Sequence, residues 1–457
     1  MEMVPKIRAH IEKYMREQNL KLQHFSDIIG INVGTLSAIL KGSRPMSMNQ
    51  LNQITSAMGL EKGYFYESYG VESFIESAPH WRRLEPYLYE CAELGKLDCI
   101  QQVITHVTDD RSYIEQLFEV AEDFFAKGLK EAALILYECV ADSEKYQHSE
   151  RLALCQYRIF LLHKTLNKFD NLKAAIKFEP YIDKLNEEVQ IDAIKDLANL
   201  YSTLHMWDKV WELAEELEKT VDFQLNFRTN RRKNKMRIAL YPIFSYEAYA
   251  NLLKASVSEK RKQYREALEY TDVYENIMNE FQNPTREEQE LIERFKGWAE
   301  GNRYLYNLML GNIEVLGAYL NFLDANPKEI LTAFVYIAKA ANQWSYNIDH
   351  ALNRFENYII QIKVEKNSEG TYNEQSSNLK YILLFYELAK YRLSQNQIQQ
   401  GIEYLITSLQ RCVSSNDDMM CIKCIDLYGK YRDRASKTQE EQYTKLIDKL
   451  GVPTFRP

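Results

Sequence analysis

The chemistry most readily recognised in this sequence lies in residues 29–45, IGINVGTLSAILKGSRP, where short side chains replace the charged ones usual on a surface helix. Asparagine, threonine and serine can hydrogen bond to base edges, valine and threonine methyl groups can contact thymine, and glycine and alanine permit close approach. The residues expected to face a DNA groove are Asn32, Val33, Gly34, Thr35, Ser37 and Ala38. Lys41 and Arg44 follow closely and are placed to contact phosphates.

Two short helices joined by a tight turn would position these residues. Apolar residues recur at helical spacing, Gly30 stands where the first helix would stop, and Asn32 can cap the second. Such a helix-turn-helix places its second helix in the major groove, with its first turns toward the bases. A plain helical bundle is the alternative, since Leu36, Ile39 and Leu40 belong to a core in either case.

Charge is unevenly spread along the 457 residues, whose net charge is −8. Residues 1–59 carry seven basic and four acidic side chains, a net charge of +3, which leaves −11 for the remainder. A small basic end on an acidic body suggests that this end meets a polyanion.

Few helix breakers, 16 glycines and 10 prolines, predict an all-α chain of long helices with short connections. Residues 117–145 read as two amphipathic helices that meet at Gly128, with small Ala133 and bulky Tyr137 where a tetratricopeptide hairpin interlocks. In weaker echoes, a polar turn is followed about five residues later by a small or apolar residue. These echoes lie at 206–217, 262–274, 310–327, 347–359 and 395–409. Stacked hairpins of this kind form a right-handed superhelix with a concave groove.

The expected organisation is a helix-turn-helix domain of five helices at 1–69, a linker at 70–81 and a repeat domain at 82–457. A long loop is expected at 366–378, KNSEGTYNEQSSN. One DNA-binding domain of this size covers half a site, so we expect a homodimer, held by the repeat domain around residues 380–450.

Several kinds of chemistry are not expected. Cys421 and Cys424 form a CxxC without a second pair, the histidines are scattered, and no glycine-rich phosphate loop or nucleophile elbow is present. The sequence therefore predicts no enzyme activity, no metal and no cofactor. The seven cysteines lack framework spacing, and there is no signal peptide or apolar run of membrane length, which predicts a cytoplasmic protein with reduced thiols and no membrane partner.

Residues 5–68 resemble the Xre/Cro-type helix-turn-helix of bacterial and phage regulators. That family often opens its first motif helix with a polar DNA-contacting residue, and here Leu22 stands at this place with Gln23 beside it. The second helix lacks an arginine or glutamine at its tip, so sequence preference would depend on DNA shape. With the repeats included, the chain resembles the RRNPP family of Gram-positive quorum-sensing regulators, which includes the phage arbitrium receptors and the PlcR/NprR-like transcription factors.

The resemblance implies a homodimer that binds a double-stranded DNA operator and a short signalling peptide, the peptide in the concave groove. The alternative is a regulator or scaffold whose repeats dock a protein partner, with no peptide ligand. A basic cluster within NFRTNRRKNKMRIALYP, 226–242, includes Arg228, Arg232 and Lys235. In a groove it would hold a peptide carboxylate; a solvated helix start and a second DNA contact are the alternatives.

Counting back from each hairpin turn gives the residues expected on the inner face of the repeats. These further peptide contacts are Lys195, Asn199, Ser202, Tyr249, Asn302, Tyr336, Gln343, Tyr386 and Lys390. Amide side chains among them would bind a peptide backbone through its N–H and C=O groups at once.

Overall fold

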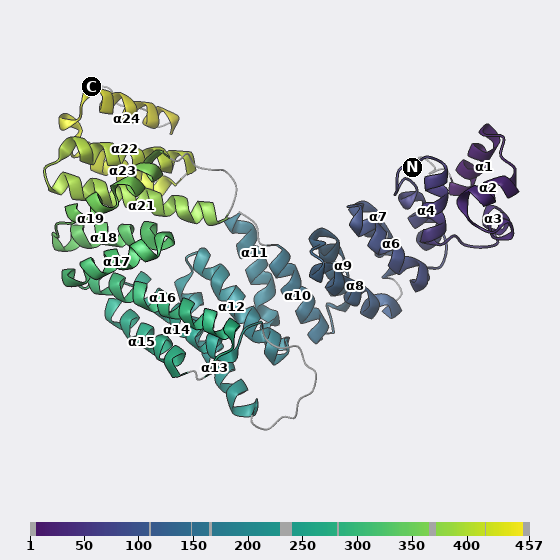
Figure 1. The fold of residues 1–457 in the computed structure, drawn as a ribbon, viewed down its shortest axis with the longest axis horizontal. Helices are drawn as coiled ribbons and strands as arrows, with labels where there is room; N and C mark the ends of the chain where they lie inside the picture. The colour runs from purple at the N-terminus through teal and green to yellow at the C-terminus, as the bar shows by residue number, and fades with distance from the viewer. Residues whose placement is uncertain are drawn as a thin grey trace. The chain divides into compact units, whose positions relative to one another are not determined.

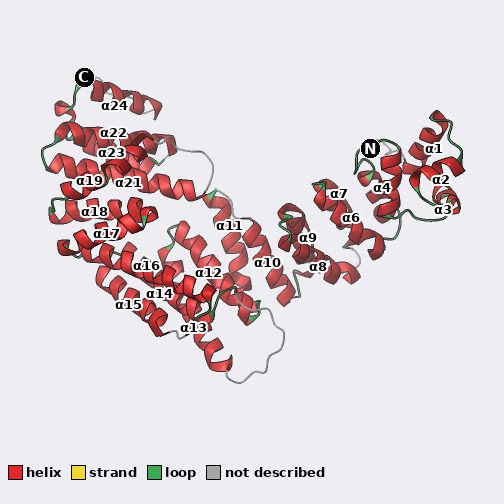
Figure 2. Ribbon diagram, in the orientation of Figure 1, coloured by secondary structure: helices red, strands yellow, loops and turns green. Residues whose placement is uncertain are grey.

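Helices make up the regular structure of every described part of the chain, so the predicted all-α class is confirmed (Figures 1 and 2). The computed structural model describes residues 6–108, 111–147, 149–163, 167–228, 240–280, 283–364, 372–415 and 417–450. Within these ranges there are 24 α-helices and no strand. None of the helices in these ranges has the length and apolar character needed to cross a membrane.

The described residues divide into two compact units, with the boundary between Asn186 and Glu187, and the second unit also includes Asn167 and Lys168. The first unit contains α1 Ile7–Glu17, α2 Leu22–Ile29, α3 Val33–Leu40, α4 Met48–Ala57, α5 Tyr66–Gly70, α6 Trp81–Glu93, α7 Leu97–Val107, α8 Ile114–Ala126, α9 Lys130–Glu144, α10 Glu150–Leu162 and α11 Lys168–Phe178. Short 3₁₀ turns precede α8 and follow α11, at Arg111–Tyr113 and Glu179–Lys184. Helices α1 to α5 match the five expected near the start of the chain.

The second unit continues the same pattern of helices joined by short turns. It contains α12 Glu187–Thr203, α13 Trp207–Arg228, α14 Ile243–Lys260, α15 Tyr264–Glu280, α16 Arg286–Met309, α17 Leu316–Ala325, α18 Ile330–Trp344, α19 Asp349–Arg354, α20 Glu356–Val364, α21 Tyr372–Ser394, α22 Ile398–Ser415, α23 Asp418–Gly429 and α24 Lys437–Lys449. Its 3₁₀ turns are Ile313–Val315, Pro327–Glu329 and Arg432–Arg434. Successive helices contact each other through most of the unit. In addition, α14 packs against α16, α16 against α18, and α18 against α21.

Most hairpin turns are made in the same way. A single residue in the turn has a positive φ, and the residue five positions after it is buried. The turn residues are Gly95, Gly128, His205, Lys262, Gly311 and Asn396. The buried residues five positions later are Ile100, Ala133, Val210, Ala267, Leu316 and Gly401. The predicted turn followed by a small or apolar residue is therefore confirmed in the 117–145 hairpin and in four of the five weaker echoes. The fifth echo, 347–359, forms the two short helices α19 and α20 instead.

The prediction of a long loop at 366–378 is wrong for its second half, because α21 already begins at Tyr372. Residues 371–378 contain no glycine or proline. Packing of α21 against α18 and α22 therefore extends a helix into residues whose polar character had suggested a loop.

The segment expected to be a linker is helical at its start. α5 runs into a π-helical turn, Val71–Ile75, in which Phe74 is 2% exposed. The rings of Phe74 and Tyr87 on α6 lie 5.2 Å apart, centre to centre. An aromatic contact thus joins this segment to α6, while the predicted domain boundaries stay a prediction.

Candidate functional site

Local interactions fix the turn between α2 and α3. Gly30 ends α2 with a φ of 68°, a conformation that residues with a Cβ rarely adopt. The Ser26 hydroxyl donates to the carbonyl oxygen of Ile31 at 2.6 Å, and Asn32 Oδ1 accepts from the backbone N–H of Gly34 at 2.8 Å. The bend at Gly30 and the cap at Asn32, both predicted from residue type, are confirmed.

Helix α3 buries one side and leaves the other accessible. Leu36 and Ile39 are no more than 1% exposed and pack in the core of the first unit. Of the predicted DNA-facing residues, the exposed ones are Asn32 and Gly34, and the half-buried ones are Val33, Thr35, Ser37 and Ala38. Because all six side chains are short or absent, the backbone of α3 can approach a partner closely.

Positive charge follows at the end of α3. Lys41 and Arg44 are exposed, and neither forms an ion pair with any other residue that the structure describes. Arg44 Nη1 lies 3.4 Å from Thr35 Oγ1, so this guanidinium lies beside the open face of α3. Gln23 is also exposed, but its carboxamide donates to Asp27 Oδ1 at 3.0 Å along α2.

Three of the predicted peptide contacts come together where α12 meets α14 in the second unit. The Tyr249 hydroxyl donates to Asn199 Oδ1, and burial raises the pKa of Tyr249 to about 12. Lys195 Nζ lies 3.3 Å from Asp196 Oδ1 and 5.4 Å from the centre of the Tyr241 ring. We call Lys195, Asn199 and Tyr249 the α12–α14 cluster.

A second polar cluster surrounds Tyr336 on α18. The Tyr336 hydroxyl donates to Glu259 Oε1, at the end of α14. Lys260 Nζ lies 2.6 Å from the same carboxylate oxygen and 3.1 Å from the Tyr336 hydroxyl. Burial and the Glu259 charge raise the pKa of Tyr336 far above its usual value, so its hydroxyl stays protonated.

Helix α21 adds a third group of polar contacts beside α18. Lys390 Nζ lies 2.9 Å from Glu387 Oε2, and Asn342 Nδ2 donates to the same oxygen at 2.8 Å. Lys390 Nζ also lies 5.8 Å from the centre of the Tyr386 ring. The α18 cluster is defined as Glu259, Lys260, Tyr336, Lys339, Asn342, Lys380, Glu387 and Lys390.

The remaining predicted peptide contacts are more scattered. Asn302 Nδ2 donates to the hydroxyl of Tyr274 at 3.2 Å, so it lies against α15. Ser202 is half-buried on α12, and Gln343 is exposed near the end of α18. The side chain of Arg228 and the whole of Arg232 and Lys235 lie outside the described residues, and the predicted carboxylate anchor there stays a prediction.

Sequence reasoning missed two lysines that contact α18, one at Tyr336 and one at Thr332. Lys339 follows Tyr336 by one helical turn on α18, and its Nζ lies 4.7 Å from the centre of the Tyr336 ring. Lys380 on α21 donates to Thr332 Oγ1, one turn before Tyr336, at 2.9 Å. The helical spacing of 332, 336 and 339 was the available signal for Lys339, whereas Lys380 adjoined the stretch predicted to be a loop.

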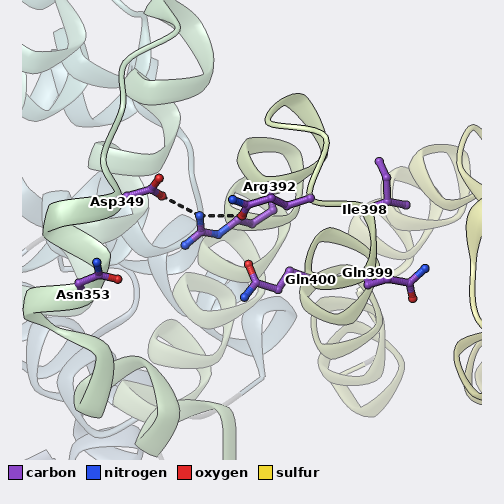
Figure 3. Close-up of a pocket in the computed structure, with 7 residues that line it drawn as sticks. Asp349, Asn353, Arg392, Ile398, Gln399 and Gln400 are labelled. Carbon is purple, nitrogen blue, oxygen red and sulfur yellow. Dashed lines mark hydrogen bonds and ion pairs between the residues drawn. The ribbon is translucent and has the colours of Figure 1, made fainter.

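An open pocket lies at another place in the second unit, between α19 and the turn from α21 to α22 (Figure 3). Arg392 Nη1 lies 2.6 Å from Asp349 Oδ1 and also donates to Gln397 Oε1 at 2.9 Å. Asn353 and Gln400 line the same pocket. Because the arginine and the aspartate neutralise each other, this arrangement is suited to joining α19 to α21.

The described residues contain no group of three or more histidine, cysteine, aspartate or glutamate side chains that could hold a metal ion. Cys421 and Cys424 are buried on α23, and the Cys424 thiol lies 3.5 Å from the Ser408 hydroxyl. Comparison of the chain with models of protein families, with curated proteins and with solved structures finds no match.

Proposed function

We propose that this chain is a transcriptional regulator that binds double-stranded DNA through α3, and that a short signalling peptide bound by its second unit controls DNA binding. The observation that carries the proposal is the composition of the accessible face of α3. Its exposed and half-buried positions hold short side chains, and Lys41 and Arg44 follow without ion-pair partners among the described residues.

A helix of this kind suits the major groove of DNA. The groove is about 12 Å wide and admits an α-helix, and short side chains let the helix lie close to the base edges. Positively charged side chains that contact the phosphates on either side of the groove hold the protein in register. Lys41 and Arg44 supply it just beyond α3, in a stretch whose net charge is positive although the chain as a whole has a net charge of −8.

The peptide part of the proposal is supported by two polar clusters that share α14. Tyr249, in the α12–α14 cluster, and Glu259, in the α18 cluster, are ten residues apart on this helix, which is about 15 Å. An extended peptide covers that distance with roughly five residues at 3.3 Å each. Asparagine carboxamides in both clusters, Asn199 and Asn342, can pair with peptide N–H and C=O groups.

Regulation requires the peptide to prefer one arrangement of the protein, because a ligand that binds two arrangements equally shifts neither. We propose a homodimer that places two copies of α3 on two half-sites. A peptide that spans the α12–α14 cluster and the α18 cluster would change the packing of α14 against its neighbours and so the spacing of the two DNA-binding ends.

The test uses the full-length protein and a library of random DNA duplexes. Selection should enrich sequences with two half-sites separated by a whole number of helical turns, as a symmetric dimer requires. Thr35→Glu should then weaken binding to the selected duplex by about tenfold or more, because a carboxylate near a phosphate costs about 1–4 kcal/mol. The new carboxylate would also pair with Arg44, whose Nη1 already lies 3.4 Å from Thr35 Oγ1.

Thr105→Glu is the matched control, since it makes the same charge change at an exposed position on α7 of the same unit. It should leave DNA binding within about twofold of wild type, because Thr105 lies on α7 and not among the residues expected to contact DNA. Equal loss in the two variants would indicate a general charge effect and contradict the assignment to α3. So would unchanged binding in Thr35→Glu.

A further inference from the structure

Lys339 is the one lysine of the α18 cluster that has neither a hydrogen bond nor an ion pair among the described residues. Lys260 lies against Glu259, and Lys390 lies against Glu387. Lys339, by contrast, forms no hydrogen bond or ion pair with any residue that the structure describes, and its close contact is the face of the Tyr336 ring. The side chain is half-buried, so water compensates its charge only in part.

The surroundings of Lys339 disfavour its charge in the absence of a ligand. Burial lowers the pKa of Lys339, and the positive charges of Lys260 and Lys390 act in the same direction. Glu387 and Glu259 oppose this effect, but each already pairs with another lysine. The charge of Lys339 therefore needs an anion that the described residues do not directly provide.

Lys380 provides a second amine on the same side of α18. Its Nζ donates to the neutral hydroxyl of Thr332, and burial lowers its pKa as well. Thr332 and Lys339 are seven residues apart on α18, about 10 Å along the helix axis, with Tyr336 between them. One amine thus lies over the Tyr336 ring and the other lies at Thr332, one helical turn before it, so one extended ligand would reach both.

We propose that Lys339, assisted by Lys380, binds a carboxylate of the peptide ligand, an inference that rests on the proposed peptide-binding function. A carboxylate is the anion that peptides carry, either on an aspartate or glutamate side chain or at the C-terminus. Next to a half-buried amine it forms a charge-assisted hydrogen bond in surroundings of lower polarity than water, where the attraction is stronger. The Tyr336 ring and the adjacent Asn342 carboxamide would contact the neighbouring peptide groups.

A library of synthetic hexapeptides with free C-termini tests the inference. The full-length protein selects binders, which are then remade in two forms: one with a C-terminal amide, and one with asparagine or glutamine in place of each aspartate or glutamate. On wild-type protein, one of these two changes should weaken binding by about tenfold or more in calorimetry, as expected for loss of a hydrogen bond between charged groups. Which change does so identifies the source of the carboxylate.

Variants of the protein show whether Lys339 is the partner. With Lys339→Gln, removal of the peptide carboxylate should change affinity by less than about twofold, since the interaction is already lost. Lys339→Arg keeps the charge and should keep the dependence on the carboxylate. Lys430→Gln is the control and should keep the dependence on the carboxylate, because Lys430 is an exposed lysine that directly follows α23 and pairs with Asp426.

The outcomes separate the inference from the function on which it rests. Peptides that bind wild-type protein without needing any carboxylate would overturn the carboxylate subsite and leave the peptide function in place. The same would follow if Lys339→Gln kept the full dependence on the carboxylate. Selection of no peptide at all by wild-type protein would overturn both. Melting curves of the variants check that they remain folded. Lys339→Met, which removes the charge and keeps an apolar chain on the Tyr336 ring, replaces Lys339→Gln if that variant does not fold.

Discussion

The close approach of α22 to α21 makes a sharp prediction about Gly401. A Cβ on Gly401 would lie 2.6 Å from Leu393 Cγ and 3.1 Å from the Leu393 backbone nitrogen, both too close for ordinary contact. Leu393 is only 5% exposed, so its side chain has little space to move. Gly297 lies in the interior of α16, and a Cβ added there would meet no atom within 4 Å.

Comparison of the two alanine variants isolates the packing effect. Alanine is favoured over glycine within a helix by about 0.5–1 kcal/mol, so Gly297→Ala should raise the free energy of unfolding by about that amount. Gly401→Ala gains the same preference but must overpack a filled site, which costs about 1–3 kcal/mol. The difference between the two variants should therefore equal the packing cost, with Gly401→Ala the less stable.

Tryptophan fluorescence during urea unfolding measures this difference. The second unit contains Trp207, Trp211, Trp298 and Trp344, whereas the first contains only Trp81, so the signal reports mainly the unit that carries both glycines. The urea concentration at the midpoint of unfolding should fall for Gly401→Ala and rise for Gly297→Ala. The dependence of the free energy of unfolding on urea should be the same in both variants. Equal stability of the two variants would refute the close packing of α21 against α22 at Gly401.

Two further predictions concern polar groups. Asn32→Ala should destabilise the α2–α3 region by about 1 kcal/mol, because the N–H of Gly34 loses its acceptor; faster hydrogen exchange in α3 measures this, and exchange in Asn32→Asp, which keeps an acceptor, should stay near wild type. Burial raises the pKa of Asp192 above 3.8. A carboxyl whose pKa is higher in the folded state stabilises the protein when protonated, and this contribution is lost as pH rises through the folded pKa. The stability of Asp192→Asn relative to wild type should therefore increase as pH rises above about 4 in urea unfolding; a constant difference would show that the Asp192 charge is not disfavoured.

Features that depend on neighbouring residues could be predicted from the sequence. Gly30 and Asn32 act within a few residues of their own position, and residue type alone indicated a bend and a cap. Gly128 marked its hairpin turn for the same reason, since a positive φ favours glycine. His205, Lys262 and Asn396 make equivalent turns without glycine, and there the signal was a polar stretch followed about five residues later by a small or apolar residue.

Features that depend on the rotation of a helix against its neighbours were harder to predict. A shift of one residue turns a helix by about 100°, so a small error in repeat phase moves a side chain to another face. Tyr336 was expected among the peptide contacts and lies in the α18 cluster, whereas Lys339, three residues later, was overlooked. Asn302 was expected on the same inner face, yet its carboxamide reaches Tyr274 on α15.

The charges of the second unit separate side chains that hold the fold from those available to a ligand. Arg392 pairs with Asp349, and Arg303 pairs with both Asp272 and Glu275, so these arginines join neighbouring helices. Lys339 does the opposite: its desolvation lowers stability, and only the face of the Tyr336 ring and two carboxylates already paired with other lysines offset it. An apolar side chain of similar length would pack on Tyr336 without that loss. Residues that reduce stability in this way are expected where binding requires them, so Lys339 rather than Arg392 is the side chain expected to bind an anion.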